Sequence, residues 1–197
     1  MKYSQADLIG DELYLRSDDA TWRGKLLTRL FKTKKVRLEL QIPQTYLLRG
    51  EILCDDINLM TDDIIDVAFI IDVLCYDFVN ELARSKTGPL APFRYLMDRY
   101  SKTLQVAHYQ SKKVDEFTEY HIEQLELTPY KVYLRYKEVL RLEWFLKDLE
   151  EEVKDHNFTV EKILEILYCN LIELVKKGEA DRGINIIIKT LEEGIKR

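Results

Sequence analysis

The spacing of apolar residues changes once along this 197-residue chain, and that change constrains the fold more than any other feature. Residues 36–42, VRLELQI, alternate apolar and polar side chains, as a half-buried strand does. The segment TYLLRGEIL (45–53) is predicted to return as the neighbouring strand, and a shorter strand is expected around Leu13 and Leu15. From Thr61 the apolar residues recur with helical spacing. The pattern predicts an α+β fold, with a small N-terminal antiparallel sheet and a predominantly helical remainder.

Capping residues suggest where these helices begin and end. Thr61 is expected to cap a helix that runs to about Arg84, and a second helix is expected after Pro92. A third is predicted to start at Thr128–Pro129, because proline suits the first helical position. Residues 114–127 fit a strand and a helix equally well.

The C-terminal part carries the clearest helix signals. TVEKILEILYCNLIELVKKG (159–178) has a threonine cap, lysines in the last turn and a glycine stop. ADRGINIIIKTLEEGIKR (180–197) follows as a second helix, and the short turn predicts an antiparallel αα-hairpin. We expect an α+β domain over residues 1–157 with the hairpin, residues 158–197, packed on it as part of one domain.

The sequence DDIID (62–66) is the strongest candidate for a metal site. It resembles the D-D-x-x-D pattern of prenyl-diphosphate synthases, which implies magnesium held by Asp62 and Asp66. Those enzymes need a second acidic motif and a much longer helical chain, and this sequence has neither. We therefore expect a solvated helix face without a metal ion, and a metal-dependent enzyme using Asp62 and Asp66 is an alternative.

Asp72 is predicted to lie on the opposite, apolar side of the same helix. A carboxylate there is costly unless it is paired, so we expect it to be buried and to accept a hydrogen bond or an ion pair. A general acid or base in a pocket, or a contact in a subunit interface, are the alternatives.

Recognisable catalytic motifs are missing from the sequence. The three histidines have no metal-ligand spacing, and Cys54, Cys75 and Cys169 form no C-x-x-C pair. Phosphate-binding and nucleophile motifs are not found, so we expect no catalytic residues, no metal and no cofactor. The N-terminal MKYSQADLIG lacks the apolar core of a signal peptide and no apolar run reaches a membrane-spanning length, which predicts a cytoplasmic protein without a membrane span.

Charge is strongly segregated along the chain. Residues 22–37 carry no acid, whereas residues 51–83 hold nine acids and no lysine or arginine. Residues 20–32 are predicted to form a helix whose apolar stripe, Trp22, Leu26 and Leu30, faces the core. The candidate residues for binding a partner or an anion are Arg23, Lys25, Arg29, Lys32, Lys34 and Lys35. The simpler explanation of this charge segregation is that the basic segment 22–37 and the acidic segment 51–83 pair with each other inside the fold.

The sequence therefore favours a non-enzymatic cytoplasmic interaction or regulatory protein that associates with itself or with a protein partner. Nucleic-acid binding through residues 22–37 is the first alternative. It is not favoured, because the net charge of the chain is −5.

Overall fold

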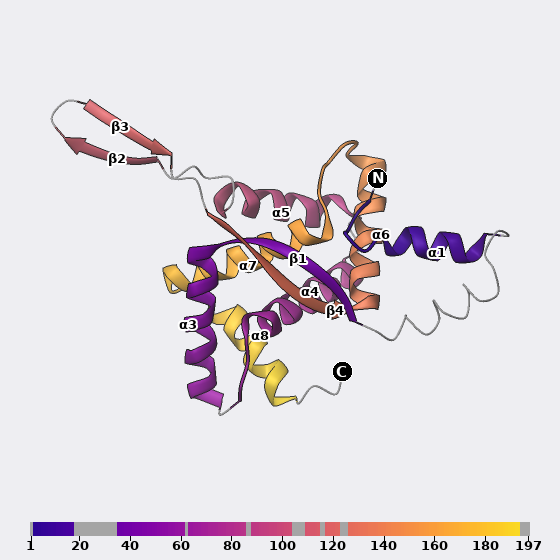
Figure 1. The fold of residues 1–197 in the computed structure, drawn as a ribbon, viewed down its shortest axis with the longest axis horizontal. Helices are drawn as coiled ribbons and strands as arrows, with labels where there is room; N and C mark the ends of the chain where they lie inside the picture. Colours follow the sequence, from indigo (N-terminus) through magenta and orange to yellow (C-terminus); the bar gives the residue numbers. More distant parts are fainter. Residues whose placement is uncertain are drawn as a thin grey trace.

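The computed structural model of this chain is mostly helical around a two-stranded antiparallel sheet, which confirms the predicted α+β class (Figure 1). The structure describes residues 2–17, 35–61, 63–85, 88–103, 109–114, 117–122 and 126–193, with the backbone alone described for 109–114 and 117–122. The elements are α1 (Leu8–Arg16), β1 (Lys35–Pro43), α3 (Gln44–Thr61), α4 (Val67–Arg84), α5 (Leu90–Thr103), β2 (Tyr109–Val114), β3 (Phe117–Ile122), β4 (Leu127–Arg135), α6 (Tyr136–Glu152), α7 (Val160–Lys177) and α8 (Asp181–Glu192). No helix among these residues is both long and apolar enough to cross a membrane.

Strand β1 is the half-buried strand that its alternation predicts. Leu38, Leu40 and Ile42 are fully buried, and the residues between them face outward. The partner of β1 is β4, from much later in the chain, paired antiparallel with Leu38 opposite Val132. The prediction that residues 45–53 return as the neighbouring strand is wrong, because these residues belong to α3.

Strand β4 occupies the place where a helix was expected to begin. Pro129 lies inside β4 opposite Gln41, and the helix α6 starts only at Tyr136, so the prediction of a helix start at Thr128–Pro129 is wrong. Proline has no N–H to donate, which a strand tolerates when it has a neighbour on one side. Among the described strands β4 pairs with β1 alone.

The predicted strand around Leu13 and Leu15 is also wrong, because these residues lie in helix α1. Asp7 stands at its N-cap but makes no side-chain capping bond. The fully buried Glu143 of α6 takes this role: its carboxylate accepts hydrogen bonds from the Leu8 and Ile9 N–H groups, at 3.0 and 2.7 Å, and from the Ser4 hydroxyl. A carboxylate at the positive end of a helix stabilises that end.

Helix α4 begins later than predicted and ends where predicted. Thr61 is the last residue of α3, and its hydroxyl donates back to the Ile57 carbonyl oxygen at 2.9 Å, so it does not cap α4. The cap is Asp66, whose carboxylate accepts a hydrogen bond from the Phe69 N–H at 2.8 Å. The end of α4 at Arg84 confirms the predicted end of this helix.

The next segment contains the second helix and a hairpin. Helix α5 already starts at Leu90, before Pro92, and ends at Thr103. Strands β2 and β3 then pair antiparallel. Because β3 covers Phe117–Ile122 and β4 starts at Leu127, the described part of the ambiguous segment 114–127 is strand except for Glu126.

Helix α7 passes through the middle of the fold, between α4 and α5 (Figure 1), and contacts β1, α4 and α5. Its predicted ends are confirmed: Thr159 accepts a hydrogen bond from the Lys162 N–H, and Gly178 ends the helix with a left-handed φ of 71°. The second predicted helix is α8, which follows a short turn. There, Gly183 approaches Leu171 so closely that a Cβ atom would lie 2.6 Å from the leucine side chain. The division of the chain at residue 157 remains a prediction.

Candidate functional site: the outer face of helix α3

Helix α3 carries apolar side chains on both of its sides. One side packs into the core through Tyr46, Leu47, Gly50, Leu53, Cys54 and Ile57. Their spacing of three and four residues places them together on one face of the helix. Other apolar residues of α3 point away from this face and are exposed.

We call this second side the outer face of α3. Its central stripe is Leu48, Ile52 and Leu59, which are 53%, 60% and 83% exposed and fall within a narrow arc of the helix. Met60, 62% exposed, lies in the last turn of α3, and Ile64, 97% exposed, lies beyond the helix end. Single exposed apolar residues are ordinary, but a contiguous row of them marks an interaction surface.

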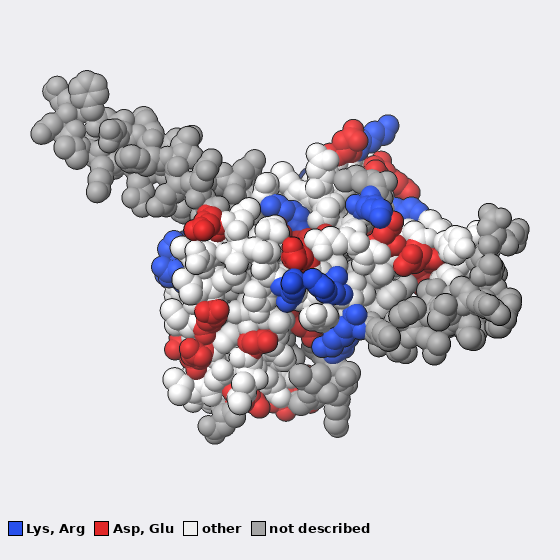
Figure 2. Space-filling view, viewed as in Figure 1, with Lys and Arg blue, Asp and Glu red and all other residues white. Residues whose placement is uncertain are grey.

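Carboxylates accompany this apolar stripe. Glu51, Asp55 and Asp56 are exposed on the same side of α3, and Asp63 lies two residues beyond its last residue, Thr61. Acidic side chains lie among uncharged ones over α3, at the left of the molecule (Figure 2). The outer face therefore combines exposed apolar area with a net negative charge, because its three carboxylates outnumber the exposed Arg49 of the same helix.

Residues 63–66 of the DDIID sequence lie in the connection between α3 and α4, so the prediction that its carboxylates share one helix face is wrong. Asp66 is the N-cap of α4, and its carboxylate already accepts the Phe69 N–H. Asp62 lies outside the described residues. No group of three or more His, Cys, Asp or Glu residues in the described part of the chain is arranged to hold a metal ion.

Asp72 lies on α4 and is half-buried. Its Oδ1 atom is buried, and no described residue donates a hydrogen bond to it. Burial, reinforced by the nearby carboxylates of Glu138 and Asp72, raises the pKa of the Cys75 thiol well above its usual value. Because no described residue donates to Asp72 Oδ1, the hydrogen bond or ion pair expected for Asp72 stays a prediction.

Most of the predicted basic site lies outside the described residues, namely Arg23, Lys25, Arg29, Lys32 and Lys34, together with the predicted helix 20–32. Lys35 is described, and it is exposed at the start of β1 opposite Arg135. The next outward-facing pairs are Arg37 with Tyr133 and Glu39 with Lys131. Basic side chains thus gather over the sheet of β1 and β4 around Tyr133, which is 54% exposed (Figure 2).

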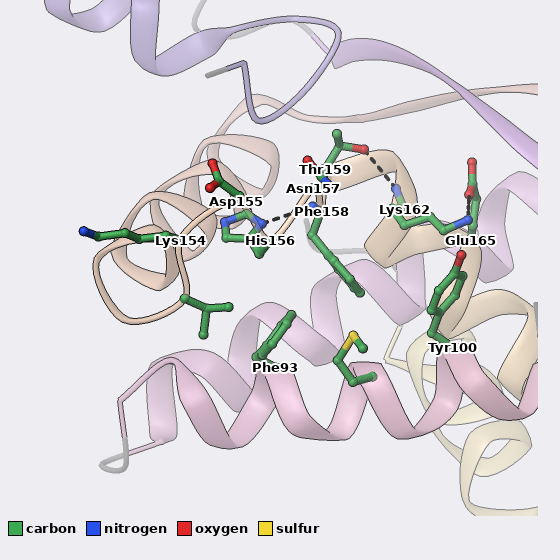
Figure 3. A pocket seen from close by; sticks show the side chains of 12 residues that line it. Phe93, Tyr100, Lys154, Asp155, His156, Asn157, Phe158, Thr159, Lys162 and Glu165 are labelled. Atoms are coloured by element: carbon green, nitrogen blue, oxygen red, sulfur yellow. Dashed lines mark hydrogen bonds and ion pairs between the residues drawn. The ribbon is translucent and has the colours of Figure 1, made fainter. Parts of the chain in front are cut away.

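A pocket of about 590 Å³ lies between α5 and the connection from α6 to α7 (Figure 3). His156 forms part of its wall, but both ring nitrogens are engaged by the backbone: Nδ1 accepts the Phe158 N–H, and Nε2 lies 3.0 Å from the Leu146 carbonyl oxygen. Lys162 contacts the Glu165 carboxylate at 3.3 Å and lies over the Tyr100 ring. These groups hold the walls together, and none of them is placed as a free base or nucleophile.

The three cysteines are also poorly suited to nucleophilic chemistry. All are free and buried. Burial and nearby carboxylates raise the pKa of Cys54 to about 12, and burial raises that of Cys169 as well. A thiol is nucleophilic as its thiolate, so these side chains act as apolar core residues.

The sequence held signals for both surfaces that the predictions missed. The spacing of Leu48, Ile52 and Leu59, beside the inner stripe, is that of a helix with two apolar sides, not of a strand. The alternation of Lys131, Tyr133 and Arg135 with apolar residues marks a strand with one basic face.

Comparison of the chain with protein-family models, with curated proteins and with solved structures finds no match.

Proposed function

We propose that this protein is a non-enzymatic, cytoplasmic interaction protein whose outer face of α3 binds a basic amphipathic helix of a partner protein. The main support for this proposal is the exposed row of Leu48, Ile52 and Leu59 with carboxylates beside it. An amphipathic helix that docks in this way presents apolar side chains at helical spacing. Lysine or arginine beside those side chains would complement the charge of Glu51, Asp55 and Asp56.

The charge also argues for a different protein as the partner. A second copy that met this face with its own α3 would bring carboxylates against carboxylates, and like charges in contact oppose association. Free, buried thiols suit a reducing compartment, which supports a cytoplasmic location for the interaction.

The expected affinity follows from the exposed apolar area. Complete burial of a leucine, isoleucine or methionine side chain contributes about 1.5–3 kcal/mol, and the five apolar residues of this surface retain half or more of their exposure. Burying them contributes roughly 5–10 kcal/mol before the costs of association, which are themselves several kcal/mol. We therefore expect a weak complex, with a Kd between about 0.1 and 1 mM when ion pairs assist.

A fluorescence anisotropy titration tests the proposal with synthetic peptides as long as α3, which has 18 residues. The first peptide has a leucine stripe flanked by lysines, the second has glutamates in place of the lysines, and the third has the first composition in scrambled order. We expect only the first to bind. Ile52→Asp/Leu59→Asp should abolish binding, whereas Leu127→Asp, at a residue 51% exposed on β4, should leave it unchanged.

Two results would contradict the proposal. Equal binding of the scrambled peptide would reduce the interaction to non-specific charge attraction. Unchanged affinity in Ile52→Asp/Leu59→Asp, with the fold intact by circular dichroism, would place the binding surface elsewhere.

A second candidate function, nucleic-acid binding, is supported by the basic residues around Tyr133 on the sheet. Lysine and arginine contact phosphates, and an exposed tyrosine stacks on bases. The patch is small and the chain is acidic overall, so we rank this function second.

A further inference from the structure

A second cavity, of about 460 Å³, is a partly open pocket among four helices: α4, α5, α7 and α8. The apolar part of its lining includes Leu74 and Phe78 from α4, Leu167 and Leu171 from α7, and Ile186 from α8. This volume lies within the range of pockets that hold small molecules, about 300–1,000 Å³. The cavity is separate from the outer face of α3.

Asn170, on α7, contributes a polar group to the floor of this cavity. Its side chain is only 9% exposed, yet its amide makes no hydrogen bond within the described part of the chain. The amide is not sealed from solvent, so its donor and acceptor atoms are open to the cavity. The amide of Asn170 lines the cavity, where a ligand would supply both a donor and an acceptor for it.

Arg99, on α5, lines the same cavity and has the same deficit. Its Nε atom is buried without a hydrogen-bond acceptor, and the nearest carboxylate oxygen, Asp98 Oδ2, lies 4.0 Å away. The guanidinium rests over the Tyr95 ring, 5.2 Å from its centroid, which fixes its position. A planar guanidinium held in this way is suited to binding a carboxylate.

Among the other charged residues that line the cavity, one carboxylate is available to bind a cationic group of a ligand. Arg182 of α8 and Glu81 of α4 pair with each other at 3.1 Å, and Glu179 is exposed to solvent. Asp77, half-buried on α4, forms no ion pair with a described residue. Asp77 and Arg99 come from different helices and both line this cavity, so it offers a negative and a positive group to one ligand.

From this arrangement we infer that the cavity binds a small zwitterion with an apolar side chain, that is, an apolar or aromatic α-amino acid. The ligand carboxylate pairs with Arg99 and its ammonium group with Asp77, while Asn170 hydrogen-bonds to the polar end. The apolar side chain of the ligand packs among Leu74, Phe78 and Leu171. The site does not depend on the binding of a partner at α3.

Isothermal titration calorimetry on the full chain tests this inference with L-phenylalanine and L-leucine as probes. 3-Phenylpropionate lacks the ammonium group, phenethylamine lacks the carboxylate, and L-serine lacks the apolar side chain. We expect the two apolar amino acids to bind at least tenfold more tightly than each of the three control compounds. Equal binding of either singly charged compound, or no binding of the amino acids, would overturn the inference.

Variants then assign the residues. Arg99→Gln should weaken binding of L-phenylalanine at least tenfold, whereas Arg94→Gln, at an exposed residue of the same helix, should not change it. Asn170→Leu should abolish binding and raise the melting temperature, because it replaces a buried amide that lacks a protein partner. A lower melting temperature with unchanged binding would show that Asn170 serves the fold and not a ligand, and would overturn its assignment.

Discussion

Gly50 allows α3 to dock against α7, and its replacement by alanine should destabilise the protein. An ideal Cβ atom at this position would overlap the hydroxyl oxygen of Tyr168 and lie 2.9 Å from its ring carbon Cζ. Tyr168 is fully buried, and its hydroxyl donates a hydrogen bond of 3.0 Å to the Tyr46 carbonyl oxygen. The new methyl group must therefore displace either the tyrosine or the helix.

The size of the effect follows from three contributions. Overpacking in a core costs about 1–3 kcal/mol, and loss of the tyrosine hydrogen bond costs about 1 kcal/mol. Alanine is the better helix former, which offsets about 0.5–1 kcal/mol. We expect Gly50→Ala to lower the free energy of unfolding by about 2 kcal/mol.

Denaturant unfolding followed by circular dichroism measures this change, and Tyr168→Phe provides the matched background. Without the hydroxyl oxygen most of the overlap disappears, so Gly50→Ala should cost less than about 1 kcal/mol in Tyr168→Phe. If Gly50→Ala instead stabilises the protein by about 1 kcal/mol, as in an exposed helix, then α3 does not dock on α7 as described.

Three further predictions concern buried and surface charge. Replacing Glu143 by alanine leaves the Leu8 and Ile9 N–H groups without their acceptor, so it should lower the free energy of unfolding by about 3 kcal/mol in urea titrations; a change below about 1 kcal/mol would refute the capping role. Burial raises the pKa of Glu165, so its contribution to stability is fully present below the unfolded-state pKa and is lost as pH rises through the folded-state pKa. Thermal melts should therefore show the wild type losing stability relative to Glu165→Gln between about pH 4 and 7, and the opposite slope would contradict the assignment. DNA and RNA should bind no tighter than about 1 μM, and tight binding in moderate salt that Lys25→Glu/Arg29→Glu abolishes would favour the nucleic-acid function.

Local patterns in the sequence predicted the elements that depend on nearby residues. The strand β1 follows from alternation over seven residues, and α7 follows from a threonine cap, helical spacing and a glycine stop within one segment. Both signals arise from the geometry of a single element, so they can be recognised without knowing what the element packs against.

The errors arose where distant residues decide the structure. Helix α1 has no local cap and is capped by Glu143, far along the chain, so its short sequence resembled a strand. Helix α3 was mistaken for a strand because its two apolar sides hide the helical period. The cavity near Asn170 lies among four helices. No sequence pattern reveals that the side-chain amide of Asn170 lacks a partner.

Methyl NMR of protein labelled at isoleucine and leucine tests whether the outer face of α3 is the binding surface. On addition of the lysine–leucine peptide, the methyl signals of Ile52, Leu59 and Ile64 should shift in proportion to saturation. The signals of Leu13 and Leu127, each 51% exposed on other elements, should stay in place. Shifts at Leu13 or Leu127 with none on α3 would contradict the claim.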